Sequence, residues 1–188
     1  MGENEIKIGT QTWTSKNLNV STYRNGDDIP QVQGQRWEEW FNLTTGAWCY
    51  HENKTANGTT YGKLYNWYAV NDPRGLAPKG YHIPTDAEWT ILTTYLGTDA
   101  AAKMKSTTGW NEDGNGTNES GFAGLPSGCR ASNLFKDFDN IGANGFWWSS
   151  SESDTSGAWF RNLGYDNGNV FSYFFNKLFG FSVRCLRD

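Results

Sequence analysis

The chain has 188 residues, with 16 lysines and arginines against 20 aspartates and glutamates, and a formal net charge of −4 at pH 7. This length predicts one domain spanning residues 1–188, and the acidic balance, with no run of basic residues, argues against a nucleic-acid partner. No apolar run is long enough for a membrane-spanning helix, which argues against direct membrane insertion.

Tryptophan and glycine are both frequent, with 10 and 22 residues. This combination predicts a loop-rich fold in which large rings cover backbone that lies outside regular ladders, and it is not typical of a helical bundle. The three cysteines, Cys49, Cys129 and Cys185, are too widely spaced for a zinc ligand set or a dense disulfide framework. One disulfide with one free thiol, and three reduced thiols, both remain open.

The first half of the chain predicts a mixture of short elements. Residues 6–13 alternate apolar and polar side chains around a glycine, which predicts a hairpin. Residues 25–28 predict a turn, and residues 37–48 predict irregular structure held by aromatic rings. Residues 61–70 carry apolar side chains at helical spacing and stop before a proline, so we expect a short helix there.

The strongest local pattern predicts a helix that begins after Thr85. The Thr85 hydroxyl can cap the free amides of the first turn, and Glu88, three residues later, can reach back to the Thr85 amide. An apolar stripe follows, formed by Trp89, Leu92 and Leu96. Gly97 supplies the stop, and residues 99–105, which are rich in alanine, predict a second helix.

The second half of the chain predicts loops and strands. Residues 110–122 predict a loop, and short strands are expected at residues 145–151, 156–162, 168–173 and 180–186. The order of elements therefore predicts an α+β fold with short antiparallel strands, two to three short helices and long loops, and with the two chain ends adjacent.

Several segments in order, covering some 180 residues, resemble the Fibrobacter succinogenes major paralogous domain family. The matching segments are residues 8–13 with 17–18, then 61–67, 80–89, 116–122, 148–150 and 180–185. The resemblance implies a C-type-lectin-like fold of the formylglycine-generating-enzyme branch, found mainly in exported bacterial surface proteins. It also implies kinship with the variable proteins of diversity-generating retroelements. Ala77 stands where the family often has a cysteine, so Cys185 is expected to be free or differently paired.

The enzymes that share this fold indicate which residues catalysis would need. Its oxidase relatives bind copper through a close pair of C-terminal cysteines, whereas this chain has Cys185 alone in that region. Its iron-dependent relatives need a histidine cluster, whereas this chain has two histidines, His51 and His82. We expect His82 to be structural and His51 to lie at the surface. Ser149–Ser151 lack the glycine-flanked turn of a hydrolase nucleophile, so we expect no enzyme activity and no cofactor.

One loop holds oxygen-bearing side chains of the kind that calcium prefers. Asp113, Asn115 and Thr117 make it a weak calcium candidate, although the glycine spacing of a helix-loop-helix calcium site is missing. The alternative is a loop whose side chains bond its own backbone.

The C-terminal 43 residues concentrate the rings, with 12 of the 30 aromatic side chains of the chain and no histidine. Residues 171–179 carry rings in a stretch too unbroken to alternate cleanly, so at most half of them can face one core. The remainder should form an exposed apolar patch of the kind that marks an interaction site. Each of the residues at 171–176, 178 and 179 could also be encoded by a codon that arises from the asparagine codon AAC when only its adenines are changed. Retroelement diversification acts by that rule. The alternative is a buried aromatic hairpin.

We therefore predict a non-enzymatic recognition or adhesion module of a bacterium or phage. Its ligand would be a protein or a glycan on another surface. The scaffold would include Trp147, Trp159, Phe181 and Arg184. The predicted contact face consists of Asp154, Thr155, Phe160, Asn162, Tyr165, Asp166, Asn167, Asn169, Phe171, Tyr173, Phe174, Phe175, Asn176 and Phe179.

Location and alternatives follow from the same features. Residues 1–5 are polar and lack the apolar segment of a signal peptide, so a cytoplasmic protein, an exported module without its signal and a virion part all remain open. The family resemblance favours the cell surface or a phage particle. The alternative functions are a metal-dependent oxidase of the formylglycine-generating-enzyme type and a structural module of a surface fibre.

Overall fold

The computed structural model describes residues 4–34, 37–133 and 136–188, which form a mixed α+β fold. The strands are β1 (Glu5–Ile8), β2 (Gln11–Thr14), β3 (Trp48–Cys49), β4 (Leu64–Tyr65), β5 (Tyr81–His82), β6 (Ser127–Asn133), β7 (Lys136–Ile141), β8 (Asn144–Glu152), β9 (Gly157–Gly164), β10 (Val170–Asn176) and β11 (Leu186–Arg187). The helices are α1 (Trp37–Phe41), α2 (Thr55–Tyr61), α3 (Trp67–Val70), α4 (Asp86–Leu96) and α5 (Ala100–Met104), with a 3-10 turn, η1 (His51–Asn53).

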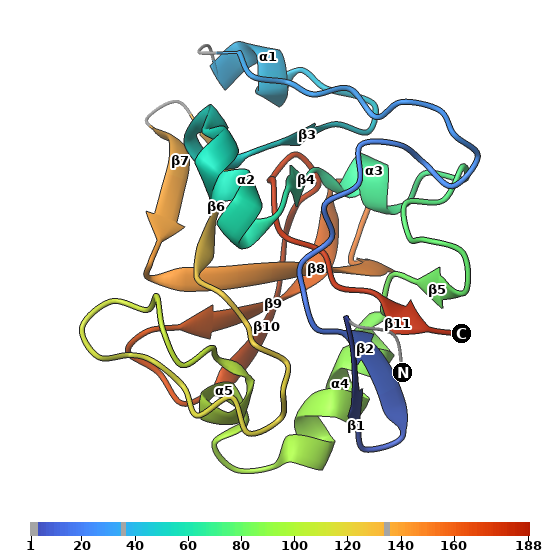
Figure 1. The fold of residues 1–188 in the computed structure, drawn as a ribbon. Coiled ribbons are helices and arrows are strands. Elements are labelled where there is room, and N and C mark those ends of the chain that lie inside the picture. Colours follow the sequence, from blue (N-terminus) through green and yellow to red (C-terminus); the bar gives the residue numbers. More distant parts are fainter. Residues whose placement is uncertain (1–3, 35–36, 134–135) are drawn as a thin grey trace.

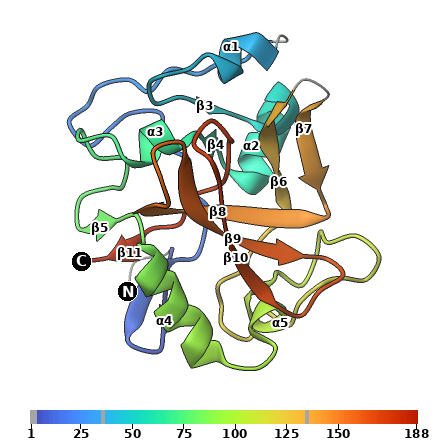
Figure 2. The same ribbon diagram turned by 180° about the vertical axis from the view of Figure 1, so that it is seen from behind.

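The strands form three sheets. Their orders are β1-β2-β11-β5, β10-β9-β8-β6-β7 and β3-β4. The five-stranded sheet crosses the middle of the molecule, with α4 and α5 on one side of it and α1, α2 and α3 on the other (Figures 1 and 2). In the described part of the chain, no helix is long and apolar enough to cross a membrane.

The four-stranded sheet joins the first and last elements of the chain. The hairpin expected at residues 6–13 is confirmed as β1 and β2, which turn through Gly9 at a φ of 61°. β11 pairs with β2 on one side and with β5 on the other. The prediction that the two ends of the chain lie together is therefore confirmed.

Helix α4 begins and ends as the sequence predicts. The Thr85 hydroxyl accepts a hydrogen bond from the Glu88 amide at 3.2 Å, and the Glu88 carboxylate accepts one from the Thr85 amide at 2.8 Å. The predicted stripe is buried in the core: Trp89, Leu92 and Leu96. The helix expected at residues 99–105 is present as α5.

Two predictions for the middle of the chain are wrong in part. The helix expected at residues 61–70 is split into the end of α2, the strand β4 and the short helix α3. The split occurs because the Tyr65 backbone pairs with Phe181 in both directions, at 2.9 and 3.1 Å, and because the Asn66 side chain then caps α3. Part of the segment expected to be irregular, residues 37–48, forms α1 and the start of β3.

The five-stranded sheet contains the strands expected at residues 145–151, 156–162 and 168–173, although β10 continues to Asn176. β6 and β7 were not predicted. The segment expected as a strand at residues 180–186 forms mostly single bridges, and a regular strand begins only at Leu186.

Aromatic clusters cover both faces of this sheet. Trp148, Phe160 and Phe181 belong to one cluster, and Trp147 and Leu163 belong to the other. Neighbouring residues of a strand point to opposite faces, so Trp147 and Trp148 enter different clusters. β8 and β9 are therefore buried on both sides. A third, smaller cluster contains Trp40, Ala47, Cys49 and Leu64.

The three cysteines are buried and unpaired. Burial raises the pKa of each thiol to about 12. Of the two arrangements left open by the sequence, the structure has three free thiols.

Candidate functional site

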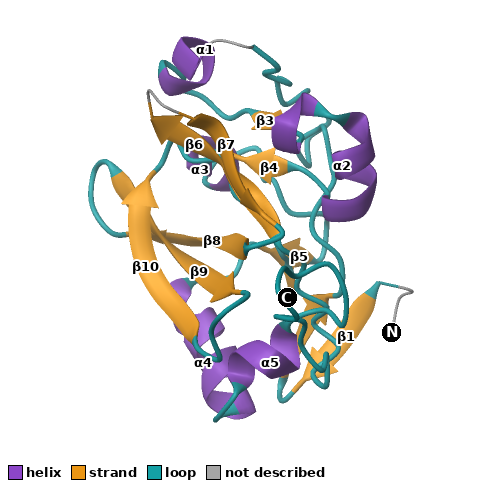
Figure 3. Cartoon of the chain, turned by 90° about the vertical axis from the view of Figure 1, so that its left-hand side faces the viewer, coloured by secondary structure: helices purple, strands orange, loops and turns teal. Residues whose placement is uncertain are grey.

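Strand β10 forms one border of the five-stranded sheet. Among the strands that the structure describes, β9 is its only neighbour, and Figure 3 shows β10 along the outside of the molecule. Three consecutive rings of this strand are large and exposed: Tyr173 at 52%, Phe174 at 54% and Phe175 at 48%. The prediction that residues 171–179 present an exposed apolar patch is supported by these values, and the buried-hairpin alternative is not.

The rings of β10 lie on both faces of the strand. Tyr173 stands opposite Phe160 and Phe175 opposite Ala158, while Phe174 stands opposite Trp159 on the other face. The Phe174 and Trp159 rings meet edge to face with centroids 5.5 Å apart. Directly opposed residues of an antiparallel pair share a face, so the strand offers rings to a partner on either side.

On the first face the rings continue from the edge into the core. Phe171 stacks on Tyr173 with centroids 5.7 Å apart, and Phe175 meets Phe179 at 4.3 Å. Phe179 in turn lies 5.7 Å from the buried Phe181. Tyr173 and Phe175 also lie 6.3 and 6.4 Å from the buried Phe160, so the exposed rings of this face are held in place by the core.

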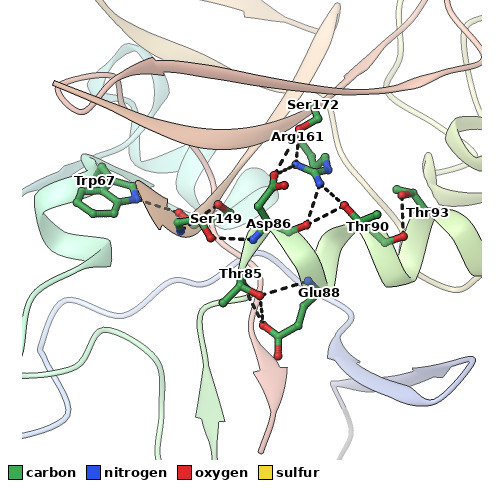
Figure 4. Close-up of polar contacts among 10 residues, drawn as sticks. Trp67, Thr85, Asp86, Glu88, Thr90, Thr93, Ser149, Arg161 and Ser172 are labelled. Carbon is green, nitrogen blue, oxygen red and sulfur yellow. Dashed lines mark hydrogen bonds and ion pairs between the residues drawn. The ribbon is translucent and has the colours of Figure 1, made fainter. Parts of the chain in front are cut away.

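A buried arginine ties the β9–β10 hairpin to helix α4. Arg161 is 3% exposed, and its guanidinium donates to the Asp86 carboxylate, to the Asp86 carbonyl and the Thr90 hydroxyl at 3.0 Å each, and to the Ser172 hydroxyl at 2.7 Å (Figure 4). Asp86 is the first residue of α4, and its amide donates to the Ser151 hydroxyl of β8 at 3.0 Å. The helix start and three strands are therefore joined at one point beneath β10.

Arg161 was not predicted from the sequence. The available signal was a single charge in a strand of otherwise uncharged residues, with an acidic helix start elsewhere in the chain. A charge in such a strand needs a partner when it is buried.

The loop between β8 and β9 lies at one end of β10 and holds Asp154 and Thr155. Hydrogen bonds from the amide and hydroxyl of Ser156 hold the pKa of Asp154 below its ordinary value. Both predicted residues are exposed. The loop is fastened by the buried Lys177, which donates to the Glu152 carboxylate at 2.8 Å and to the Thr155 carbonyl at 3.0 Å.

The turn between β9 and β10 lies at the other end and holds Tyr165, Asp166, Asn167 and Asn169. Asp166 and Asn169 are exposed, and Tyr165 packs against the core. The side-chain oxygen of Asn167 accepts a hydrogen bond from the Asn169 amide at 2.8 Å. A cavity of about 300 Å³ adjoins this turn, lined by Asn169 and Val170 and by residues of the α4–α5 junction, including Asp99. Since seven residues of strand separate the two ends by about 20 Å, the predicted residues form a strip and not a single pocket.

Three predictions about individual residues need correction. Phe160, expected in the contact face, is 5% exposed because its position on β9 points into the cluster around Trp148. Asn162 is half-buried, and its amide donates to the carbonyls of Gly145 and Leu163 at 3.2 Å. Trp159, expected in the scaffold, is only half-buried and packs on Phe174.

The other predicted scaffold residues are buried: Trp147, Phe181 and Arg184. Arg184 is one of the residues that line a cavity of about 580 Å³, and burial lowers the pKa of its guanidinium to about 9. It donates to the side-chain oxygen of Asn17 and to the carbonyls of Thr14 and Phe122, each at 2.8 Å. None of the predicted contact residues lines this cavity.

The histidines differ from each other. His82 bonds carboxylates with both ring nitrogens, Asp188 at 2.8 Å and Glu88 at 2.9 Å, so the prediction of a structural role is supported. The prediction that His51 lies at the surface is wrong, because its ring is buried with its centroid 5.2 Å from that of Phe138.

The calcium candidate is not assembled. The Asn115 side-chain oxygen accepts the Trp110 amide at 3.1 Å, and the Thr117 hydroxyl donates to the Ala102 carbonyl at 3.3 Å. Asp113 is exposed. The Asn115 bond lies within the loop, as in the alternative interpretation, and the Thr117 bond joins the loop to α5. Among the residues that the structure describes, no three histidines, cysteines or carboxylates come together in a way that could hold a metal ion.

The comparisons with known proteins identify the family and nothing narrower. No curated protein and no solved structure matches the chain. The family profile of the Fibrobacter succinogenes major domain matches residues 6–187. The chain belongs to the Fibrobacter succinogenes major domain family.

Proposed function

We propose that the chain is a non-enzymatic recognition module whose ligand, a protein or a glycan, binds the border of the five-stranded sheet. One observation carries the proposal: Tyr173, Phe174 and Phe175 are adjacent, about half exposed and anchored on a rigid frame. Tyrosine and phenylalanine supply large contact areas at low cost in conformational entropy.

The area of these rings is sufficient for a binding centre. A tyrosine or phenylalanine side chain has roughly 150–250 Å² to bury, so three half-exposed rings offer roughly 300 Å². At about 25 cal/mol per Å² this corresponds to about 7 kcal/mol before the costs of association. A standard interface buries about 800 Å² on each partner, so the exposed residues of the two loops would contribute the remainder.

The proposal includes the finer fold and setting. A C-type-lectin-like fold is consistent with the short helices, the long loops and the sheet that joins the first and last strands. We place the module on the surface of a bacterium or on a phage particle, and we propose β10 and its loops as the segment that a retroelement would diversify. The alternatives are a metal-dependent oxidase and a fibre module. Exposed rings on a fixed strand favour recognition over a spacer role.

The test uses binders selected on the immobilised chain from a random-peptide display library and from a glycan array. Phe174→Arg should weaken the selected binders about 30-fold, which corresponds to about 2 kcal/mol, and should leave the melting temperature within about 2 °C. Tyr95→Arg is the matched control, because Tyr95 is a 65% exposed ring on α4, away from the face. Binders that are indifferent to Phe174→Arg, or a large loss of thermal stability in that variant, would refute the proposal.

A further inference from the structure

The free border of β10 has a defined set of backbone groups. The Lys177 amide donates to the Ser156 carbonyl at 2.9 Å, and residues of an antiparallel pair alternate between bonded and non-bonded positions. Continuing this alternation along the register directs the amides of Tyr173 and Phe175 toward β9. The amides of Ser172, Phe174 and Asn176 then point away from the sheet.

This border lacks the features that usually protect an edge strand. β10 runs for seven residues, VFSYFFN, without a charge, a proline or a glycine. Its register with β9 shows no shift, whereas the β8–β9 pair has one between Trp148 and Glu152. Edge strands that are not meant to pair carry charges, prolines or bulges. An uncharged edge with an unbroken register is suited to accepting another strand.

We infer that β10 binds an extended peptide segment of a partner protein as a sixth strand of the sheet. This inference rests on the proposed function and specifies its partner. The peptide backbone would bond the outward amides, and its alternate side chains would lie beside Tyr173 and Phe175 on one face and beside Phe174 on the other. Main-chain bonds supply affinity in such complexes, and side chains supply specificity.

The charges at the ends of the strand define the partner further. Asp154 and Glu152 are exposed at one end, and Asp166 and Asp99 are exposed at the other. Two buried lysines lie near these ends, Lys177 against Glu152 and Lys105 near Asp166, and the charges of Asp154 and Asp99 have no such cation beside them among the described residues. The ends therefore favour a peptide with an apolar, strand-forming centre and lysine or arginine at its flanks.

The same charges disfavour a second copy of this chain. Antiparallel pairing of β10 with itself would place the Asp166 end of one copy beside the Asp154 end of the other. Like charges at both ends of a self-complementary interface oppose its formation.

The experiment uses twelve-residue peptides selected from a random-peptide display library on the wild-type chain. We expect them to carry basic flanks, and we expect glutamate in place of those flanks to weaken binding at least tenfold. Methylation of single peptide amides should abolish binding at every second position of the centre. Hydrogen exchange should show the amides of Ser172, Phe174 and Asn176 becoming protected on binding, whereas those of Tyr173 and Phe175 are protected beforehand.

The outcomes separate this inference from the proposed function. Peptides that depend on Phe174 but show neither alternation nor new amide protection would overturn strand addition and leave the recognition face intact. The peptide library could also yield no peptide that depends on Phe174 while the glycan array yields a glycan that does. This result would likewise overturn strand addition and leave the recognition face intact. Protection of the three outward amides in the chain alone, with a dimer in sedimentation, would overturn it in favour of a second copy. If neither the peptides nor the glycans depend on Phe174 for binding, both the proposed function and strand addition are refuted.

Discussion

Replacing Lys105 with methionine tests whether buried cations hold the loops of this fold. The Lys105 ammonium lies in the interior and donates to the carbonyls of Gly164, Tyr165 and Asn167 at 3.2, 3.5 and 3.4 Å. It also lies 5.3 Å from the centroid of the Trp110 ring. Methionine keeps most of the apolar stem but leaves the three carbonyls of the β9–β10 turn without their donor.

The expected loss is about 3 kcal/mol, the low end of the sum for three carbonyls. An unsatisfied buried polar group costs about 1–3 kcal/mol, and the lengths of these three bonds place their sum toward the low end. For a chain of this size, that loss lowers the melting temperature by about 5–10 °C. Thermal unfolding followed by circular dichroism measures it, with the exposed Lys79→Met as the control, expected within about 0.5 kcal/mol of wild type. A Lys105→Met protein as stable as wild type would refute the idea that the ammonium holds the turn.

Three further predictions concern the frame. Burial lowers the pKa of His82, but its bonds to two carboxylates raise it above its ordinary value, so its stabilising contribution is complete below about pH 6.5 and is lost as the pH rises through the folded-state pKa. His82→Gln should therefore cost more stability at pH 5.5 than at pH 8.5 in urea unfolding, and an equal cost at both would contradict the assignment. Thr85→Ala should remove the capping box and about 1 kcal/mol, whereas Thr94→Ala, exposed on the same helix, should be nearly neutral by the same assay. The three buried thiols should resist an aromatic disulfide reagent at pH 8 in the native protein and all react in guanidinium; rapid reaction of the native protein would show that the cores open.

The elements predicted well from the sequence are those whose cause is local. The α4 helix has its capping box, its stripe and its stop within residues 85–97, and no distant contact is needed to specify them. The β1–β2 hairpin is likewise fixed by alternation around Gly9. Exposure of the β10 rings was predicted because so many consecutive rings cannot share one core.

The elements missed are those whose residues carry no clear pattern of their own. β6 and β7 read SGCRASN and KDFDNI, without an alternating apolar pattern. β6 is a strand because it pairs with β7 and β8, the next two strands in the chain, and because Arg130 bridges to the distant Gly180. The error at Phe160 has a related origin. Composition indicated a contact residue, but only the register opposite Trp148 shows that the Phe160 ring enters a core cluster.

Because β10 lies at the border of the sheet, substitutions of its exposed rings cost less folding stability than substitutions of the buried residues of β9. Phe160 belongs to a core cluster, and removing a buried phenylalanine ring costs about 3–5 kcal/mol. Phe174 is half exposed, so replacing it removes about half of that contact area and leaves no enclosed cavity. The free energy of unfolding of a domain is about 5–15 kcal/mol. One substitution at Phe160 would therefore remove a large part of it, whereas several substitutions along β10 would not. Since Arg161 and Lys177 hold the hairpin from β9 and from beyond the end of β10, its position does not depend on which rings β10 carries. A strand fixed in this way can change its exposed rings while the sheet beneath it persists, which is the physical requirement of the diversification proposed above.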